Sequence, residues 1–179
     1  KMRKAFIAEK GKALLSLDYS QIELRIAASL SGDPEMMKIF SAGGGSAFGG
    51  NSGGDFHTAT ASKIFDINPE QVSPAQRRAA KTINFSVLYG VSAFGLSERS
   101  AMPRAEAANY IKKYYSVFST LKNYLDSLIA QAHKQGFLTN ALGRIRYFPE
   151  IHSPNYGIRS ASERQAINMP MQSLAADII

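Results

Sequence analysis

The feature that most constrains the fold is an unbroken stretch over residues 75–89, which contains neither proline nor glycine. Ser73 and Pro74 precede it, and serine followed by proline is a frequent beginning of an α-helix. Gly90 follows it, and glycine commonly ends a helix because it tolerates a left-handed backbone. The pattern therefore predicts a helix over residues 73–90.

One face of this predicted helix combines cations with aromatic rings. Its members recur every four residues and so form one slowly drifting stripe, the Arg77–Tyr89 stripe: Arg77, Lys81, Phe85 and Tyr89. Apolar residues lie largely away from the stripe and suit packing: Ala80, Ile83, Val87 and Leu88. A ligand with phosphates at one end and a flat ring at the other would fit the stripe, because cations neutralise phosphate and aromatic rings stack on bases. A solvated helix surface with a little core is the simpler alternative.

The composition favours a globular chain with a polyanionic partner. The 179 residues are 45% hydrophobic, which is enough for a core. Twenty-one Lys and Arg against 14 Asp and Glu give a net charge of +7, which favours nucleic acid over a membrane surface. No run of 18 apolar residues exists and residues 1–4 lack a signal-peptide core, so no membrane association is expected. The chain has no cysteine, which excludes disulfides and thiolate metal sites and fits a reducing compartment.

A candidate metal ligand follows a short apolar run. Residues 13–17 predict a buried strand, and Asp18 stands at its end, where metals and phosphates commonly bind at the edge of a sheet. Asp18 could equally cap the next helix, since Asp is a good N-cap. Apolar spacing then predicts a helix up to Gly32, with Glu23 in its first turn and close to Asp18.

Glycine is concentrated over residues 41–54, which hold half of the 14 glycines of the chain. This composition predicts a flexible linker or surface loop, natural or engineered, and the stretch lacks the order of a phosphate-binding loop. A helix is expected before it, from Pro34, and another after it, capped by Asp55. His57 falls in the first turn of that second helix, where the helix dipole favours an anion.

The second half of the chain predicts helices and one hairpin. Short helices are expected near residues 96–101 and from Pro103, and a longer one ends at Gly136. Residues 137–148 predict two strands with basic residues at the turn, among them Arg144, which could contact a phosphate backbone or simply be surface charge.

A last helix is predicted from about residue 160. Arg164, Asn168 and Gln172 are four apart and form one polar face, and Pro170 should bend the helix. Amide side chains suit the acceptors of a duplex minor groove, where such contacts sense pairing geometry more than sequence. A solvated helix face is the alternative.

Four segments, in this order, carry a resemblance to a known family. They are Asp-Tyr-Ser-Gln-Ile-Glu-Leu-Arg at 18–25, Asp-Phe-His-Thr-Ala-Thr at 55–60, the 77–90 stretch that begins Arg-Arg-Ala-Ala-Lys, and Glu-Arg-Gln-Ala-Ile-Asn-Met-Pro-Met-Gln at 163–172. Together they closely resemble the family A DNA polymerases, of the bacterial DNA polymerase I type. The first resembles motif A of that family and the third resembles motif B on the fingers helix. The match covers nearly the whole chain, the glycine-rich stretch excepted.

The resemblance implies a DNA-directed DNA polymerase with a two-metal mechanism. Asp18 would be one of the carboxylates that hold two Mg²⁺ ions, assisted by the backbone carbonyl of Tyr19, because Mg²⁺ prefers such oxygens. The residues that resemble the nucleotide-binding positions are Gln21, Glu23, His57, Arg77, Lys81, Phe85 and Tyr89. Lys81 would also act in catalysis.

The resemblance also implies a role for single positions. His57, Arg77 and Lys81 would hold the triphosphate of a dNTP, with Phe85 against its sugar and base and Tyr89 near the templating position. Glu23 resembles the steric gate that excludes ribonucleotides. The residues that would contact the primer–template DNA are Arg144, Arg164, Asn168 and Gln172.

The implied architecture is an α+β, predominantly helical fold: part of a polymerase palm with an inserted all-α fingers subdomain and a β-hairpin. Residues 1–32 and 136–179 would belong to the palm, and residues 33–135 to the fingers. We expect a monomer whose partners are primer–template DNA and dNTPs. Its location would be the cytoplasm or nucleoid of a bacterium or phage-infected cell, with an organelle also open.

One departure from the family pattern limits the expected activity. The second catalytic carboxylate of the family lies in a later His-Asp-Glu motif, and this sequence ends before such a motif, inside a predicted helix. A single carboxylate cannot offset two divalent ions, so we expect the isolated chain not to extend a primer. Two alternatives remain: a non-catalytic module that binds primer–template or nucleotide, and a single-subunit RNA polymerase, against which Glu23 argues.

Overall fold

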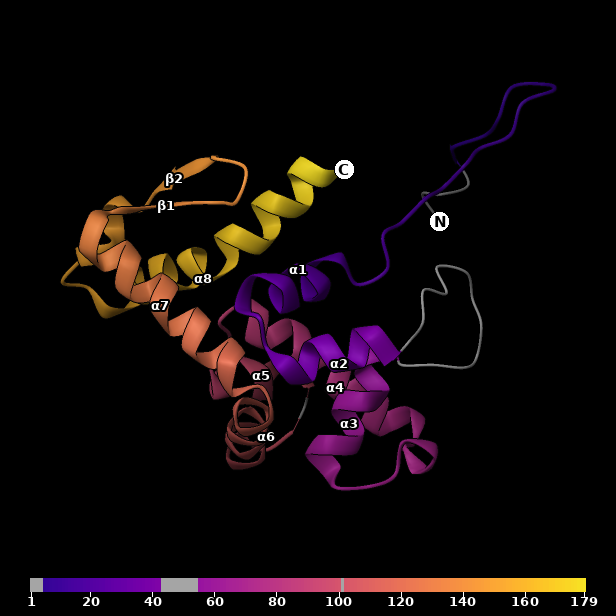
Figure 1. Cartoon of the computed structure of the whole chain (residues 1–179), viewed down its shortest axis with the longest axis horizontal. Coiled ribbons are helices and arrows are strands. Elements are labelled where there is room, and N and C mark those ends of the chain that lie inside the picture. Colours follow the sequence, from indigo (N-terminus) through magenta and orange to yellow (C-terminus); the bar gives the residue numbers. More distant parts are fainter. Residues whose placement is uncertain (1–4, 43–54, 101) are drawn as a thin grey trace.

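The structure is a computed structural model that describes residues 5–42, 55–100 and 102–179, and most of these residues are helical (Figure 1). Its α-helices are α1 (Ile22–Ser31), α2 (Pro34–Ala42), α3 (Phe56–Phe65), α4 (Pro74–Leu88), α5 (Ala93–Ser100), α6 (Arg104–Val117), α7 (Ser119–Gln135) and α8 (Tyr156–Ile178). Two short strands, β1 (Phe137–Thr139) and β2 (Ile145–Tyr147), form an antiparallel hairpin. The 3-10 turns η2 (Pro69–Gln71) and η3 (Pro149–His152) lie between helices α3 and α4 and before helix α8. The predicted α+β, predominantly helical class is confirmed.

Helix α4 has the bounds that the sequence predicted. The Gln76 N–H donates to the Ser73 hydroxyl at 3.3 Å, and the Ser73 N–H donates to the Gln76 amide oxygen at 2.9 Å. This capping box satisfies two backbone donors that the first turn of a helix would otherwise leave without partners. At the other end the chain leaves the helix through Gly90, whose φ is 61°.

Helix α1 packs in the core and carries the second half of the 18–25 segment. Leu24 and Ala27 are completely buried, because α1 packs against α4, α7 and α8. Asp33, just after α1, is buried and accepts hydrogen bonds from the N–H groups of Met36 in α2 and Leu121 in α7, each at 3.1 Å. One carboxylate therefore connects three helices around the core.

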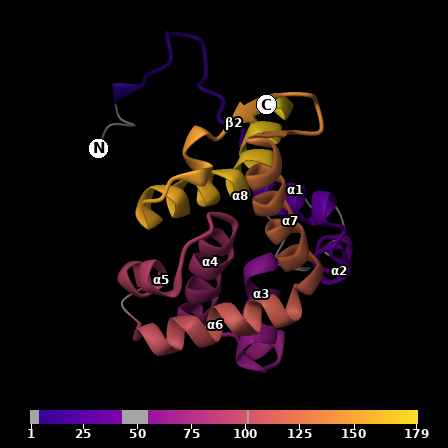
Figure 2. The same cartoon turned by 90° about the vertical axis from the view of Figure 1, so that its left-hand side faces the viewer.

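Aromatic stacking fills the core beneath α3. Phe56 is completely buried, with its ring centroid 4.9 Å from that of Phe40 and 5.8 Å from that of Phe118. Stacked arrangements of this kind add to the free energy gained by burying the rings. Figure 2 shows α3 and α4 on one side of the molecule and α8 on the other, with α7 joining them. None of the described helices is long and apolar enough to cross a membrane.

The prediction of a buried strand over residues 13–17 is wrong. This segment is irregular and exposed, with Leu15 82% and Leu17 81% accessible, and it projects away from the helices (Figure 1). A strand needs a neighbouring strand for its backbone hydrogen bonds, and within the described ranges strand pairing is limited to β1 and β2. Local hydrophobicity therefore could not make this segment a strand.

Several predicted boundaries shift. Helix α2 continues through Ala42, into the stretch predicted as a loop, and the rest of that glycine-rich stretch, 43–54, lies outside the described residues. Helix α5 begins at Ala93 rather than near 96. Helix α8 begins at Tyr156 rather than near 160, because the Asn155 side chain accepts a hydrogen bond from the Gly157 N–H at 2.9 Å and caps it early. The alternative in which Asp18 caps the next helix is excluded, since the cap position of α1 is Gln21.

Replacing Gly90 by alanine should destabilise the chain. A Cβ at this position would lie 3.0 Å from the Cδ1 atom of Ile167 and 3.1 Å from the Cγ atom of Arg164 in α8, in addition to the strain of a positive φ. We expect the free energy of unfolding to fall by about 1–3 kcal/mol, as measured by urea denaturation. Gly32→Ala is the matched control, because Gly32 has a φ of 63° but a Cβ added there would meet no other atom within 4 Å in the described structure. An equal loss in both variants would contradict the close packing of Gly90 on α8.

Candidate functional site

The Arg77–Tyr89 stripe faces outward along α4, as predicted. Arg77 and Lys81 are exposed, while Phe85 and Tyr89 are half-buried, with ring centroids 6.5 Å apart and ring planes 21° from parallel. The opposite face is buried, with at most 1% exposure for each of its members: Ala80, Ile83, Val87 and Leu88. The apolar residues therefore pack the helix onto the core, and the cations and rings lie on its other face.

Asp55 connects three segments at the cationic end of the stripe. Its side chain caps α3 by accepting the Thr58 N–H at 3.1 Å, and it accepts a hydrogen bond from the Arg77 Nε at 2.6 Å. The Gln21 amide, just before α1, donates to the same carboxylate at 3.3 Å. Burial acts to raise the pKa of Asp55, but the hydrogen bonds from Arg77 and Thr58 outweigh it and hold the pKa below its ordinary value.

His57 lies beneath the stripe and is almost completely buried. Its Nδ1 lies 2.9 Å from the Asn84 amide nitrogen, and its ring centroid lies 5.8 Å from that of Phe85. Burial lowers the pKa of His57, Asp55 acts to raise it, and the cations Arg77 and Lys81 lower it further. The net shift is downward from the ordinary value of 6.5, so the imidazole is neutral at neutral pH.

Three elements meet at the aromatic end of the stripe. The Tyr89 hydroxyl donates to the Glu23 carboxylate at 2.9 Å, which joins the end of α4 to the first turn of α1. Burial raises the pKa of Tyr89, the hydrogen bond to Glu23 raises it further, and the nearby Gln172 side chain of α8 acts in the opposite direction. Residues separated by 66 and more positions in the sequence are thus brought to one place.

Asp18 and Tyr19 are exposed on the irregular segment before α1. No group of three or more His, Cys, Asp or Glu side chains among the described residues is placed to hold a metal ion. A pair of Mg²⁺ ions requires several carboxylate oxygens, and Asp18 contributes only one carboxylate. The donor set of the described chain therefore does not fit two Mg²⁺ ions without further ligands. The closeness of Asp18 to Glu23 stays a prediction.

The polar face predicted on the last helix lies on α8. Arg164 and Gln172 are exposed, and the Arg164 guanidinium donates to the Ser160 hydroxyl at 2.8 Å. Asn168 is half-buried, and its Oδ1 atom is buried without a hydrogen-bond donor among the described residues. Because Gly90, just after α4, lies against Arg164 and Ile167, this face continues directly from the stripe.

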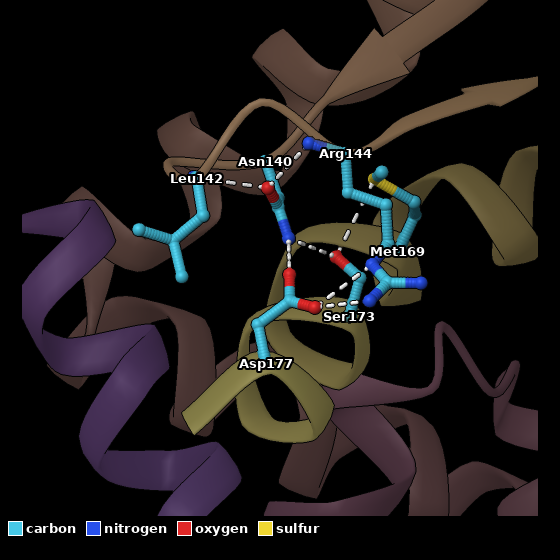
Figure 3. Close-up of polar contacts among 6 residues, drawn as sticks. All are labelled: Asn140, Leu142, Arg144, Met169, Ser173 and Asp177. Atoms are coloured by element: carbon cyan, nitrogen blue, oxygen red, sulfur yellow. Dashed lines mark hydrogen bonds and ion pairs between the residues drawn. The ribbon is translucent and has the colours of Figure 1, made fainter. Parts of the chain in front are cut away.

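Arg144 is held by the C-terminal part of α8, as Figure 3 shows. Its guanidinium forms an ion pair with Asp177, with its Nε 2.9 Å from the carboxylate. The buried Asn140 completes the connection, because its amide nitrogen donates to Asp177 at 2.7 Å and to Ser173 at 3.0 Å. The hydrogen bond and the charge of Arg144 lower the pKa of Asp177. The hairpin turn is thereby attached to α8.

A shallow groove of about 380 Å³ runs beside this connection, between the hairpin and α8. Its lining residues come from both elements: Arg144, Ile145, Arg146, Met169, Gln172, Ser173 and Ala176. The groove is therefore basic on the hairpin side and continuous with Gln172 of the polar face.

Sequence reasoning missed four contributors to the site. Asp55 was expected only to cap a helix, and its bond to Arg77 depends on tertiary structure. No sequence pattern indicated Asp177 or Asn140, because their contacts form only where the hairpin packs on α8. Asn84 could have been found, because it is a polar residue beside Ile83 on the otherwise apolar face of the predicted helix.

Comparison with known proteins identifies the class. The sequence profile of DNA polymerase family A matches residues 1–179, and the chain belongs to this family. It is 43% identical over its whole length to the thermostable DNA polymerase I of Thermus thermophilus, and 45% identical to DNA polymerase I of Pseudomonas aeruginosa. It spans 20% and 18% of those two proteins, about a fifth of their length.

A solved structure shares the fold as well as the sequence. The POL domain of Pol1 from M. smegmatis, in complex with DNA primer-template and dNTP, superposes with a TM-score of 0.79 at 38% identity. The superposition covers 90% of this chain and 27% of that one. The prediction of a family A DNA polymerase, made from four segments, is confirmed.

Proposed function

We propose that this chain forms the nucleotide-selecting part of a template-directed DNA polymerase. The observation that carries the proposal is the meeting of Glu23, Tyr89 and Gln172, which brings the motif A helix, the stripe and the polar face of α8 to one place. Membership of the family supports it, as does the solved relative that binds primer-template and dNTP. Since the chain spans about a fifth of its curated relatives, the activity belongs to the whole protein that contains it, here called the parent polymerase.

The stripe would bind the incoming nucleotide in two parts. Arg77, Lys81 and His57 would hold the triphosphate, whose charge grows on the phosphate oxygens in the transition state. Phe85 would lie against the sugar and base, and Tyr89 near the templating position. The nearly parallel rings of Phe85 and Tyr89 suit this arrangement, because flat bases stack on aromatic faces.

Glu23 would exclude ribonucleotides, and its bond to the Tyr89 hydroxyl would keep its carboxylate in place beneath the sugar. Arg164, Asn168 and Gln172 would follow the minor groove of the primer–template. Arg144 would contact the DNA backbone from its position on Asp177 beside the groove.

The remaining assignments follow from the family. Residues 1–32 and 136–179 would form part of the palm, and residues 33–135 the fingers. Asp18 and the carbonyl of Tyr19 would supply ligands to Mg²⁺, which provides charge neutralisation for phosphoryl transfer when bound. At least one more carboxylate must complete that site, so the isolated chain should not extend a primer. We place the parent polymerase in the bacterial cytoplasm.

Replacing Glu23 by alanine tests the proposal. We expect both the wild-type parent polymerase and the Glu23→Ala variant to extend a primer with dNTPs. The ratio of rNTP to dNTP incorporation should be at least roughly tenfold higher in the variant, because the side chain that crowds the ribose 2′-hydroxyl is gone. Single-nucleotide incorporation on one template, with dNTP and rNTP in parallel, measures the ratio. Glu35→Ala is the control, since Glu35 pairs with Lys63 on the surface. Unchanged selectivity in Glu23→Ala would contradict the assignment, and template-directed synthesis of RNA by the wild type would favour an RNA polymerase.

A non-catalytic nucleotide-binding module is the second candidate. Among the described residues Asp18 belongs to no group of three or more side chains that could hold a metal ion, and this favours the non-catalytic module for the isolated chain. It would bind dNTP or primer–template without turnover. Loss of turnover in the parent polymerase on replacement of Asp18, treated in the Discussion, separates the two.

A further inference from the structure

Asn84 is a buried polar residue on the packing face of α4. The exposed fraction is 0% for Asn84 and for its neighbour Ile83, and 1% for Val87. Its amide nitrogen lies 2.9 Å from Nδ1 of His57, which belongs to the first turn of α3. Burying an amide without hydrogen bonds costs free energy. The contact with His57 is therefore the reason that the structure offers for an asparagine at this position.

The contact determines which nitrogen of His57 carries the proton. An amide nitrogen only donates, so Nδ1 of the neutral imidazole must accept and is therefore unprotonated. The proton then resides on Nε2, the ring nitrogen on the far side from Asn84. In this tautomer Nε2–H is a donor, which is the form that can bind a phosphate oxygen.

The opposite orientation of the amide is less favourable. If the Asn84 oxygen faced His57, the amide nitrogen and its two N–H donors would take the buried position where Oδ1 now has no partner among the described residues. In the present orientation only the Oδ1 atom lacks a partner there. Buried N–H groups without partners are rarer in proteins than carbonyl oxygens without partners, so the orientation with Nδ1 as acceptor is preferred.

The charges around His57 decide whether the imidazole carries one proton or two, and a ring with one proton donates from only one of its nitrogens. The groups that face the imidazole are Asp55 at the cap of its own helix and the cations Arg77 and Lys81 of α4. Asp55 favours the protonated imidazole, but burial and the two cations outweigh it and lower the pKa of His57, so at neutral pH the ring has one N–H and not two. A neutral His57 with its proton on Nδ1 would present a lone pair to an anion and repel it.

We propose that Asn84 is a positioning residue that fixes His57 as the Nε2–H tautomer, so that the first turn of α3 presents a hydrogen-bond donor to a phosphate of the bound nucleotide. This inference rests on the proposed function for the identity of the anion. The tautomer itself depends only on the Asn84–His57 contact, and so the two can be tested separately.

The tautomer is measured without any ligand. Two-bond ¹H–¹⁵N correlation spectra of the full chain, at mildly alkaline pH, distinguish a neutral imidazole protonated on Nε2 from one protonated on Nδ1. We expect Nε2–H for wild-type His57 and a mixture of tautomers in Asn84→Leu. Ser86→Ala, which also changes a buried polar residue of α4, should keep the wild-type spectrum. A wild-type proton on Nδ1 would overturn the proposal while leaving the proposed function untouched.

Binding is measured in the parent polymerase with dNTP. Asn84→Leu should raise the KM for dNTP roughly tenfold with little change in kcat, because one hydrogen bond to a charged group is lost part of the time. In a His57→Ala background the same substitution should have no further effect. An equal loss in both backgrounds would mean that Asn84 only supports the fold, and would overturn the proposal.

Asn84→Asp provides a second signature that a structural role would not produce. Its carboxylate would accept a proton from Nδ1, so His57 would bind dNTP poorly when neutral and regain affinity when protonated, because the imidazolium has both N–H groups. The KM of this variant should fall as the pH is lowered through the range in which His57 titrates, relative to wild type. An unchanged pH profile in a folded Asn84→Asp variant would count against the proposal. If the wild-type parent polymerase incorporates no dNTP at all, the proposed function fails and the spectra still decide the tautomer.

Discussion

Replacing Asp18 by alanine in the parent polymerase should reduce primer extension by roughly 10³-fold or more, a loss of about 4 kcal/mol in transition-state stabilisation. In the proposed function Asp18 is the carboxylate that motif A contributes to the metal ligands, and within the described ranges no group of three or more His, Cys, Asp or Glu side chains could hold the metal instead. The side chain is exposed, so its removal should leave the fold intact. Steady-state incorporation of one dNTP, at saturating Mg²⁺, measures the effect.

The expected loss is specific to chemistry. Binding of primer–template, measured by fluorescence anisotropy, should change less than about threefold, because α8 and the hairpin are untouched. Glu9→Ala is the matched control: Glu9 lies on the same segment, is also exposed, and pairs with Lys12 at 2.5 Å. Full activity of Asp18→Ala would exclude its role as a catalytic ligand, and a parent protein without any metal-dependent turnover would support the non-catalytic module.

Replacing Lys81 by alanine should lower kcat/KM for dNTP by roughly 10²- to 10³-fold. Lys81 lies between Arg77 and Phe85 on the stripe, where an ammonium group can offset the charge that develops on the phosphate oxygens. Because the effect arises in the transition state, kcat should fall together with kcat/KM. Pre-steady-state incorporation, which separates nucleotide binding from chemistry, is the appropriate measurement.

Arg78→Ala is the matched control for Lys81→Ala. Arg78 is an exposed cation on the same helix, but it stands one residue off the stripe. Its removal should change kcat/KM far less, since a surface charge away from the triphosphate is screened by solvent. If the two variants lost the same activity, the positive charge of α4 as a whole, and not the stripe, would be responsible.

The helices were predictable from local patterns. α4 begins at Pro74 and ends before Gly90 because capping and glycine conformation act within a few residues, and the burial of Ile83 and Val87 follows from helical periodicity. The same reasoning failed at residues 13–17. An apolar run becomes a strand only when another strand pairs with it, and pairing depends on distant parts of a chain.

The stripe itself illustrates where sequence reasoning ends. Spacing predicts that Arg77 and Tyr89 share a face, but it does not predict that Asp55 accepts a bond from Arg77 or that Glu23 accepts one from Tyr89. Both partners lie on other segments of the chain. The sequence indicated Arg144 only as a candidate DNA contact. In the structure its guanidinium pairs with Asp177, which lies 33 positions away in the sequence and could not be found from local patterns.

The sequence alone determined the order of the helices, the face of α4 that carries cations and rings, and the polymerase family, because each depends on spacing along one element or on the order of motifs. Only the tertiary structure decided how these elements meet. It brought Glu23, Tyr89 and Gln172 together, and it placed Asn84 against His57. Those contacts join residues on separate helices, and they form only when burial of the shared core brings the helices into register.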